Sequence, residues 1–160
     1  MKIDAKLLRR HRACSEQVEE FEELWPKGLT IPDSARAKRA CVNKALKAHL
    51  NTRWAICLLP RQLRSKVKKE IHVIEVSYRS KYDEVSHNLF ENLNKIDRKK
   101  KYTRLFIATS KSGHRPSWYD EDLGKYNAER TAIYEKYNNE TGSISYKEKV
   151  DTALAIMNSL

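Results

Sequence analysis

The sequence predicts an all-α protein of about six helices, in which one long central helix, from about residue 61 to 97 or beyond, packs against shorter helices. Two observations predict this class. The chain of 160 residues holds only four Gly and four Pro, whereas all-β folds use far more of both in their turns. Apolar residues also recur at helical spacing through most of the chain.

The long helix is predicted by an apolar stripe whose spacings of 4, 4 and 3 repeat every 11 residues. Its positions are Leu63, Val67, Ile71, Ile74, Tyr78, Tyr82, Val85, Leu89, Leu93 and Ile96. Each repeat completes three turns at about 3.67 residues per turn, so the stripe stays on one face of a nearly straight helix. We expect a helix of roughly 50 Å that is packed along its whole length.

Shorter helices are expected before it. Asp4 can cap the first and Ser15 the second, because a side-chain oxygen accepts from first-turn backbone N–H groups. Asp33 or Ser34 starts the third. The segment 54–59 is apolar nearly all round, so we expect it at the centre of the core.

The chain beyond the stripe is less regular. Residues 102–110 are predicted to continue the helix, with a short strand as the alternative, because periodicity cannot separate the two over so few residues. Residues 111–116 predict a loop. A turn at 138–143, followed by Ser145 and Glu148 in an S-x-x-E capping box, predicts a C-terminal pair of helices.

These elements are expected to form a single helical domain over residues 1–160, since a chain of this length can bury a core without staples. Within it we distinguish N-terminal helices at 4–59, a long basic helix at 61–110 and a C-terminal helical hairpin at 117–158.

The cysteines and the lack of targeting segments favour a soluble, cytoplasmic protein. No run of about 18 apolar residues or signal-peptide core is present. Cys14, Cys41 and Cys57 cannot all pair within one chain, and their places on apolar faces suit buried thiols in a reducing compartment.

The net charge of +11 is concentrated in the middle of the chain. Residues 61–115 hold 15 basic and 6 acidic side chains, whereas residues 116–160 hold 5 basic and 8 acidic ones. A field of one sign attracts polyanions and speeds their encounter. The alternative is a lysine-rich helix face that is simply solvated.

Two basic segments form the candidate site for contact with nucleic acid or a protein partner. The candidate residues are Lys95, Arg98, Lys99, Lys100, Lys101, Tyr102, Arg104, Lys111, His114, Arg115, Arg61, Arg64 and Lys68. Lys and Arg supply flexible cations for phosphates, and Tyr102 can stack on an unpaired base. No helix-turn-helix, zinc-finger or RNA-binding signature accompanies them, so binding should be directed mainly at the backbone and should weaken with salt.

No catalytic or metal-binding motif is recognised. His11 and Cys14 have ligand-like spacing, but structural zinc sites usually need two paired clusters. The acidic residues 120–122 could hold a divalent ion, although carboxylates at the start of a helix are better explained by its dipole. We expect a non-enzymatic protein without a metal or cofactor.

Several residues resemble a known group of proteins. They are Leu8, Ala13-Cys14, Gln17-Val18, Phe21, Trp25-Pro26 and Gly28, followed by Trp54-Ala55 and Leu58-Leu59-Pro60. This pattern, with the 11-residue units that follow, resembles a loosely defined group of small phage and prophage accessory proteins over residues 7–95. Lysines stand here where that group often has acidic, alanine-rich repeats. The resemblance implies a phage-type protein of the bacterial cytoplasm and carries over no catalytic residue.

Charge and resemblance together predict a non-enzymatic accessory protein that binds nucleic acid or a host complex that handles nucleic acid. Inhibition of a bacterial defence system such as CRISPR is one form of that function. A scaffolding protein that forms a homodimer through the long helix is the first alternative, because an 11-residue period supports helix pairing. A metal-dependent nuclease with an unrecognised site is the second.

Overall fold

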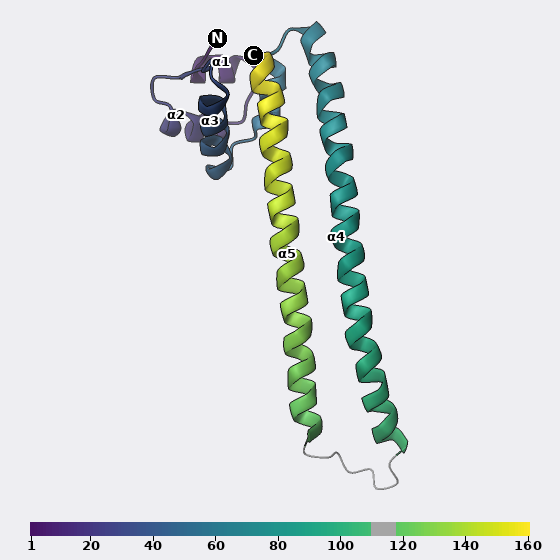
Figure 1. Cartoon of the computed structure of the whole chain (residues 1–160). Helices are drawn as coiled ribbons and strands as arrows, with labels where there is room; N and C mark the ends of the chain where they lie inside the picture. Colours follow the sequence, from purple (N-terminus) through teal and green to yellow (C-terminus); the bar gives the residue numbers. More distant parts are fainter. Residues whose placement is uncertain (110–117) are drawn as a thin grey trace. The chain divides into compact units, whose positions relative to one another are not determined.

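The computed structural model describes the backbone of residues 1–109 and 118–160 and the side chains of residues 1–98, 121 and 123–160. In chain order, its elements are β1 (Lys2–Ile3), α1 (Ala5–Arg10), α2 (Ser15–Leu24), β2 (Leu29–Thr30), α3 (Ala35–Lys47), the 3-10 helix η1 (Thr52–Leu58), α4 (Arg61–Thr109) and α5 (Trp118–Ser159) (Figure 1). The predicted all-α class is confirmed, with one long helix packed against shorter ones.

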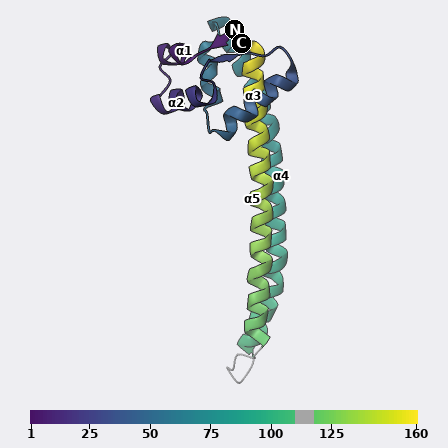
Figure 2. The same cartoon turned by 90° about the vertical axis from the view of Figure 1, so that its left-hand side faces the viewer.

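Contacts divide the chain into two compact units. Unit 1 comprises Met1–Tyr78 and Ser145–Leu160, and unit 2 comprises Arg79–Ile144. Both long helices contribute to both units, and within each unit α4 and α5 lie side by side in opposite directions (Figure 1 and Figure 2). The expectation of a single domain over residues 1–160 stays a prediction.

In the N-terminal part of unit 1, β1 and β2 pair as a two-stranded antiparallel ladder, which the sequence did not predict. Lys2 pairs with Thr30 and Ile3 with Leu29. Gly28 precedes this ladder with φ +78, and a Cβ there would lie 2.8 Å from the Ile3 carbonyl oxygen. Only glycine fits this position, because both the backbone conformation and the close approach exclude a side chain.

The helix starts in unit 1 follow two of the three predicted caps. The Leu7 N–H donates to Asp4 Oδ1 over 2.8 Å, and the Ala37 N–H donates to Ser34 Oγ over 3.2 Å. The prediction for Ser15 is wrong. Ser15 is the first helical residue, and Cys14, in extended conformation, takes the cap position without a side-chain bond.

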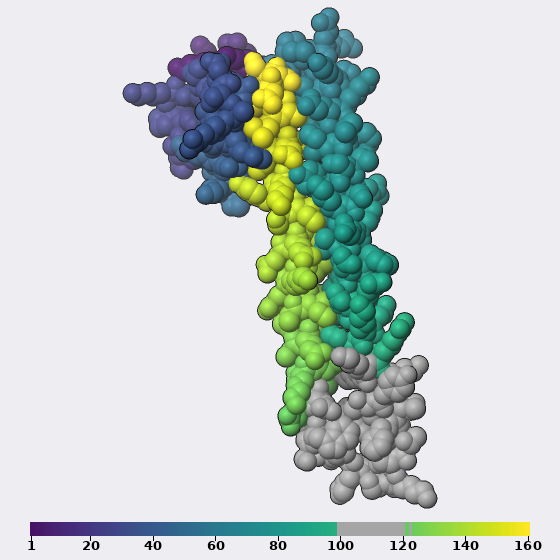
Figure 3. Space-filling view, in the orientation of Figure 1, coloured from purple at the N-terminus to yellow at the C-terminus, as the bar shows by residue number. Residues whose placement is uncertain are grey.

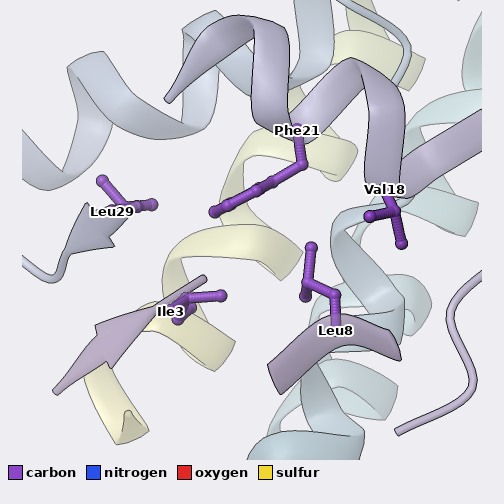
Figure 4. Packing of buried hydrophobic residues seen from close by; sticks show 5 residues of the cluster. All are labelled: Ile3, Leu8, Val18, Phe21 and Leu29. Carbon is purple, nitrogen blue, oxygen red and sulfur yellow. The ribbon is translucent and has the colours of Figure 1, made fainter. Parts of the chain in front are cut away.

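A core cluster of unit 1 joins β1, β2, α1 and α2 (Figure 4). Its buried members are Ile3, Leu8, Val18, Phe21 and Leu29. α3 packs against the C-terminal part of α5, where Val42 contacts the cluster of Val150 and Ala153. The predicted central place of residues 54–59 is wrong for all but Leu59, which is 1% exposed. Residues 54–58 are half-buried because a 3-10 helix has three residues per turn and turns only part of its surface inward.

The apolar stripe of α4 is packed within the chain, as predicted. Val67, Ile71 and Tyr78 are buried in unit 1, and Leu93 and Ile96 are buried in unit 2. Leu63, at 39% exposed, is the exception, since the cluster around Val67 forms one turn further along. The helix continues to Thr109, so the predicted helical continuation is confirmed for residues 102–109, and the strand alternative is wrong there. The predicted loop at 111–116 lies outside the described residues.

The predicted C-terminal hairpin at 117–158 is wrong, because α5 is one helix of 42 residues that runs through 138–143. Ile133, Tyr137, Thr141 and Ile144 keep helical spacing across this segment and are half-buried. A single helical Gly costs only about 1 kcal/mol relative to Ala, so Gly142 does not interrupt the helix. Consequently Ser145 lies inside the helix and caps nothing.

Candidate nucleic-acid interface

The first predicted basic segment occupies the start of α4, which forms an outer edge of unit 1 (Figure 3). Leu59 is held extended at φ −75 and ψ 146 before Pro60, so the helix begins at Arg61. We call Arg61, Arg64, Lys66, Lys68 and Lys69 the proximal basic segment. These five cations fall within the first nine residues of α4, and the first acidic residue of the helix is Glu70.

Arg64 has a structural role within this segment. Its guanidinium donates from Nε to the Leu59 carbonyl over 2.6 Å and from a terminal nitrogen to the Cys57 carbonyl over 2.8 Å. Both acceptors lie at the end of η1, where backbone carbonyls have lost their helical partners. Arg64 therefore holds the corner between η1 and α4 and is half-buried.

The other four cations of the segment point to solvent. Arg61, Lys66, Lys68 and Lys69 are exposed, and within the described residues no hydrogen bond or ion pair engages their side chains. Of these four, only Arg61 lies in the first turn of α4, where the positive end of the macrodipole disfavours a cation, and no acidic residue occupies that turn. Among the described residues no acidic partner offsets the repulsion between like charges such as Lys66 and Lys69, which lie three residues apart.

Two exposed apolar side chains continue the surface of the proximal basic segment. Val73 is 68% exposed and Val76 is 55% exposed. Their spacing from Lys69, four and then three residues, places all three on one face of α4. A ligand bound to the cations of this face would therefore also meet apolar surface.

The basic residues of α3, in contrast, are mostly engaged within unit 1. Lys38 Nζ donates to Asn158 Oδ1 over 3.1 Å, and Arg39 lies 4.0 Å from Asp151 Oδ1. Lys44 Nζ donates to the Leu24 carbonyl over 2.9 Å and lies 5.3 Å from the centre of the Trp25 ring. These contacts account for three of the five basic side chains of α3, whereas Arg36 and Lys47 are exposed and have no such contact among the described residues.

The second predicted segment lies on α4 in unit 2. Lys95 and Arg98 are exposed there. Lys99, Lys100, Lys101, Tyr102 and Arg104 belong to α4 by their backbone, but their side chains are outside the described set, and Lys111, His114 and Arg115 lie wholly outside it. The structure thus groups Arg61, Arg64 and Lys68 within two turns, and separately groups Lys95 with Arg98.

Unit 2 also holds a tyrosine–arginine cluster that the sequence reasoning missed. Tyr126 donates to Asp97 Oδ1 over 2.6 Å, and this hydrogen bond raises the pKa of Tyr126. The Arg130 guanidinium lies 5.7 Å from the Tyr126 ring centre and 5.8 Å from that of Tyr134. The signal was the spacing of four residues, which places these three side chains on one face of α5.

The prediction that all three cysteines are buried is wrong. Cys14 is exposed, because it occupies the cap position outside the first turn of α2, and Cys41 and Cys57 are half-buried. All three are free thiols. Within the described residues, no group of three His, Cys, Asp or Glu side chains is placed to hold a metal ion.

In the part of the chain that the structure describes, no helix combines the length and the apolar character needed to cross a bilayer. Comparisons of the chain with models of protein families, with curated proteins and with solved structures found no match.

Proposed function

We propose that this protein binds nucleic acid without catalysing a reaction, and that the proximal basic segment contacts the phosphate backbone. One observation carries the proposal. Arg61, Lys66, Lys68 and Lys69 are exposed cations without an intramolecular partner among the described residues, and they gather within the first nine residues of α4, before its first acidic residue. An anionic ligand would supply the counter-charge that they lack among these residues.

The chemistry of the segment favours phosphates over bases. Long, flexible Lys and Arg side chains can follow a phosphate backbone, whereas base reading needs planar side chains held in position. The field of the helix N-terminus adds to that of the cations. Four phosphate contacts to duplex DNA would give a slope of about −3.6 in a plot of log affinity against log salt.

The setting of this binding is part of the proposal. The resemblance to small phage accessory proteins supports a role in the bacterial cytoplasm, with the nucleic acid held by a host complex. A defence system such as CRISPR is such a complex, and a protein that occupies its phosphate-binding groove or covers its nucleic acid would inhibit it.

The scaffolding alternative has less support from the structure. Self-association through the apolar stripe of α4 requires that stripe to be free. In unit 1, Val67 and Ile71 pack against Ile156 of α5, and Tyr78 donates a hydrogen bond to Asp151 of the same helix. The stripe is therefore already covered by the chain's own residues in that unit.

A salt titration of binding tests the proposal. Fluorescence anisotropy would follow labelled single- and double-stranded DNA and RNA from about 50 to 200 mM salt, the range in which phosphate contacts lose most affinity. The test variant is Lys66→Gln, Lys68→Gln, Lys69→Gln. We expect weaker binding and a salt slope that is shallower by about 2.7 on duplex DNA, because three phosphate contacts are lost.

A matched control removes the same net charge elsewhere in unit 1. Lys6, Lys27 and Lys147 are exposed and lie outside the proximal basic segment. The variant Lys6→Gln, Lys27→Gln, Lys147→Gln should keep most of the affinity and the salt slope. Equal losses in both variants, or no binding at low salt, would reject the proposed interface. A third triple, Lys99→Gln, Lys100→Gln, Lys101→Gln, reports on the second predicted segment.

A further inference from the structure

Unit 1 contains an apolar cavity of about 160 Å³, partly open to solvent, between the N-terminal elements and the last turns of α5. The side chains of Ile3, Leu8, Phe21 and Leu29 form part of its wall, and they lie close together in unit 1 (Figure 4). Protein interiors rarely leave voids larger than a water molecule. A cavity of this volume matches the size of an engineered apolar cavity that stays dry and binds benzene.

The lining of the cavity specifies the charge of a ligand. Although 33% of the chain is charged, the lining residues that the structure describes include no Lys, Arg, Asp, Glu or His. Aromatic side chains from α2 and η1, those of Phe21, Trp25 and Trp54, supply part of it. A charged ligand would lose its hydration here without gaining a counter-charge, so the ligand must be neutral.

Polar groups gather at one side of the lining. The Asn51 backbone N–H donates to Gln17 Oε1 over 2.5 Å. The Asn51 side-chain amide and the Thr52 hydroxyl, which belong to two further lining residues, have no hydrogen-bond partner among the described residues. Cys14 and Asn51 line the cavity and are also exposed, so the cavity reaches the surface on this side. A ligand could enter there and place one hydrogen-bonding group beside Asn51 and Thr52.

We propose that this cavity is a binding site for a neutral molecule with one aromatic ring and a single hydroxyl or similar polar group. The volume limits the ligand to about one ring. The apolar wall binds the ring, and the polar side orients the hydroxyl, which is the usual division of labour in small-molecule pockets. This site is separate from the proximal basic segment and does not depend on the proposed nucleic-acid binding.

The two methionines of the chain provide the readout. Met157 lines the cavity, whereas Met1 is 51% exposed and does not. In the full-length protein with ¹³C-labelled methionine methyl groups, phenol should shift the Met157 resonance saturably and leave the Met1 resonance in place. Benzoate, of similar size but charged, should shift neither. Equal effects of phenol and benzoate would overturn the proposal.

Filling the cavity gives the second arm. Ala153 is buried on the α5 side of the lining, and Ala55 is half-buried on the η1 side. Ala153→Leu, and independently Ala55→Leu, should weaken the affinity for phenol, measured from the Met157 shift, by at least about tenfold. The reason is that the added side chain takes the space of the ring. Using two variants keeps the test valid if one of them fails to fold.

Ala132→Leu is the matched control, because Ala132 is exposed on the same helix and lies outside the cavity. It should leave the phenol titration unchanged. If no one-ring probe shifts the Met157 resonance, the proposal is overturned, and the cavity would then be expected to accept a side chain of a protein partner. The proposal would also be overturned if Ala153→Leu and Ala55→Leu both fold and both bind phenol as tightly as the parent protein.

Discussion

The Tyr78 hydroxyl donates a hydrogen bond of 2.6 Å to Asp151 Oδ2 and thereby joins α4 to α5 inside unit 1. Tyr78 is 6% exposed, and Arg39 of α3 lies 4.0 Å from the other oxygen of the same carboxylate. Three helices thus meet at one carboxylate. The hydrogen bond, the burial of the ring and the negative charge of Asp151 together raise the pKa of Tyr78 to about 12.

The raised pKa predicts how stability depends on alkaline pH. The Tyr78 hydroxyl loses its proton near pH 10 in the unfolded chain and near pH 12 in the folded one. Between these values the folded state binds more protons, so the free energy of unfolding falls as pH rises. The Tyr78 contribution is fully present below about pH 10. We expect Tyr78→Phe to flatten this decline and to cost about 1.5 kcal/mol at neutral pH through the lost hydrogen bond.

Urea unfolding of both proteins at several pH values between neutrality and about pH 12 measures this effect. Tyr146→Phe is a suitable control, since Tyr146 is 41% exposed and donates to the uncharged amide of Asn43. In this variant the free energy of unfolding should fall with rising alkaline pH as steeply as in the parent chain. The same slope in Tyr78→Phe as in the parent would contradict the assignment.

Two arginines at the start of α4 should separate stability from binding. Arg64 satisfies two backbone carbonyls at the end of η1, whereas Arg61 is exposed and has no hydrogen-bond or ion-pair partner among the described residues. Arg64→Ala should destabilise unit 1 by about 2 kcal/mol, because two carbonyls lose a charged donor. Arg61→Ala should leave stability within about 0.5 kcal/mol and weaken nucleic-acid binding.

Thermal unfolding and the salt titration, applied to the same two variants, give the comparison. Arg64→Lys is informative as well, since one ammonium cannot reproduce the forked contact of a guanidinium and should restore only part of the stability. Equal effects of the Arg61 and Arg64 substitutions on stability would be inconsistent with the corner contact.

The stripe of α4 was predictable because burial on one side of a long helix leaves a periodic record. Val67, Ile71 and Tyr78 are buried where the 11-residue repeat places them. The turn predicted at 138–143 was wrong because it rested on local residue preferences rather than on a periodic pattern. Asn, Gly and Ser are typical of turns, but their local preference is worth about 1 kcal/mol per residue, and the apolar positions that continue through Ile144 outweigh it.

The candidate site was only partly predictable. The charges at the start of α4 were visible in the sequence, but the role of Arg64 depends on the bend between η1 and α4, which brings the carbonyls of Cys57 and Leu59 within reach. The cavity was not predictable either. Its wall combines residues from the beginning and the end of the chain, such as Leu8 and Ile156, and no periodicity records the space left between them.

The continuity of α5 can be tested at Gly142. This residue is exposed, and an added Cβ would meet no atom within 4 Å. Gly142→Ala should therefore stabilise the protein by about 1 kcal/mol, because alanine loses less backbone entropy on entering a helix. Gly124→Ala, at an equally open position of the same helix, should stabilise to a similar degree. A loss of stability for Gly142→Ala alone would indicate a turn at this position.

The end of α3 offers the opposite kind of glycine substitution. His49 has φ 58, in the left-handed region, where a side chain costs roughly 1 kcal/mol. The chain turns there through two backbone bonds, from Leu50 N–H to the Ala45 carbonyl over 3.0 Å and from His49 N–H to the Leu46 carbonyl over 3.1 Å. This pattern is the helix ending that usually places glycine at the left-handed position.

His49→Gly should therefore raise the free energy of unfolding by about 0.5 kcal/mol, since the relief of strain exceeds the entropy that glycine adds to the unfolded chain. Ala48→Gly provides the control. Ala48 has φ −91, where glycine relieves no strain, so this neighbouring substitution should lower stability. Urea unfolding of the two variants compares them directly, and a His49→Gly protein as destabilised as Ala48→Gly would show that the His49 side chain contributes more to the fold than its backbone strain removes.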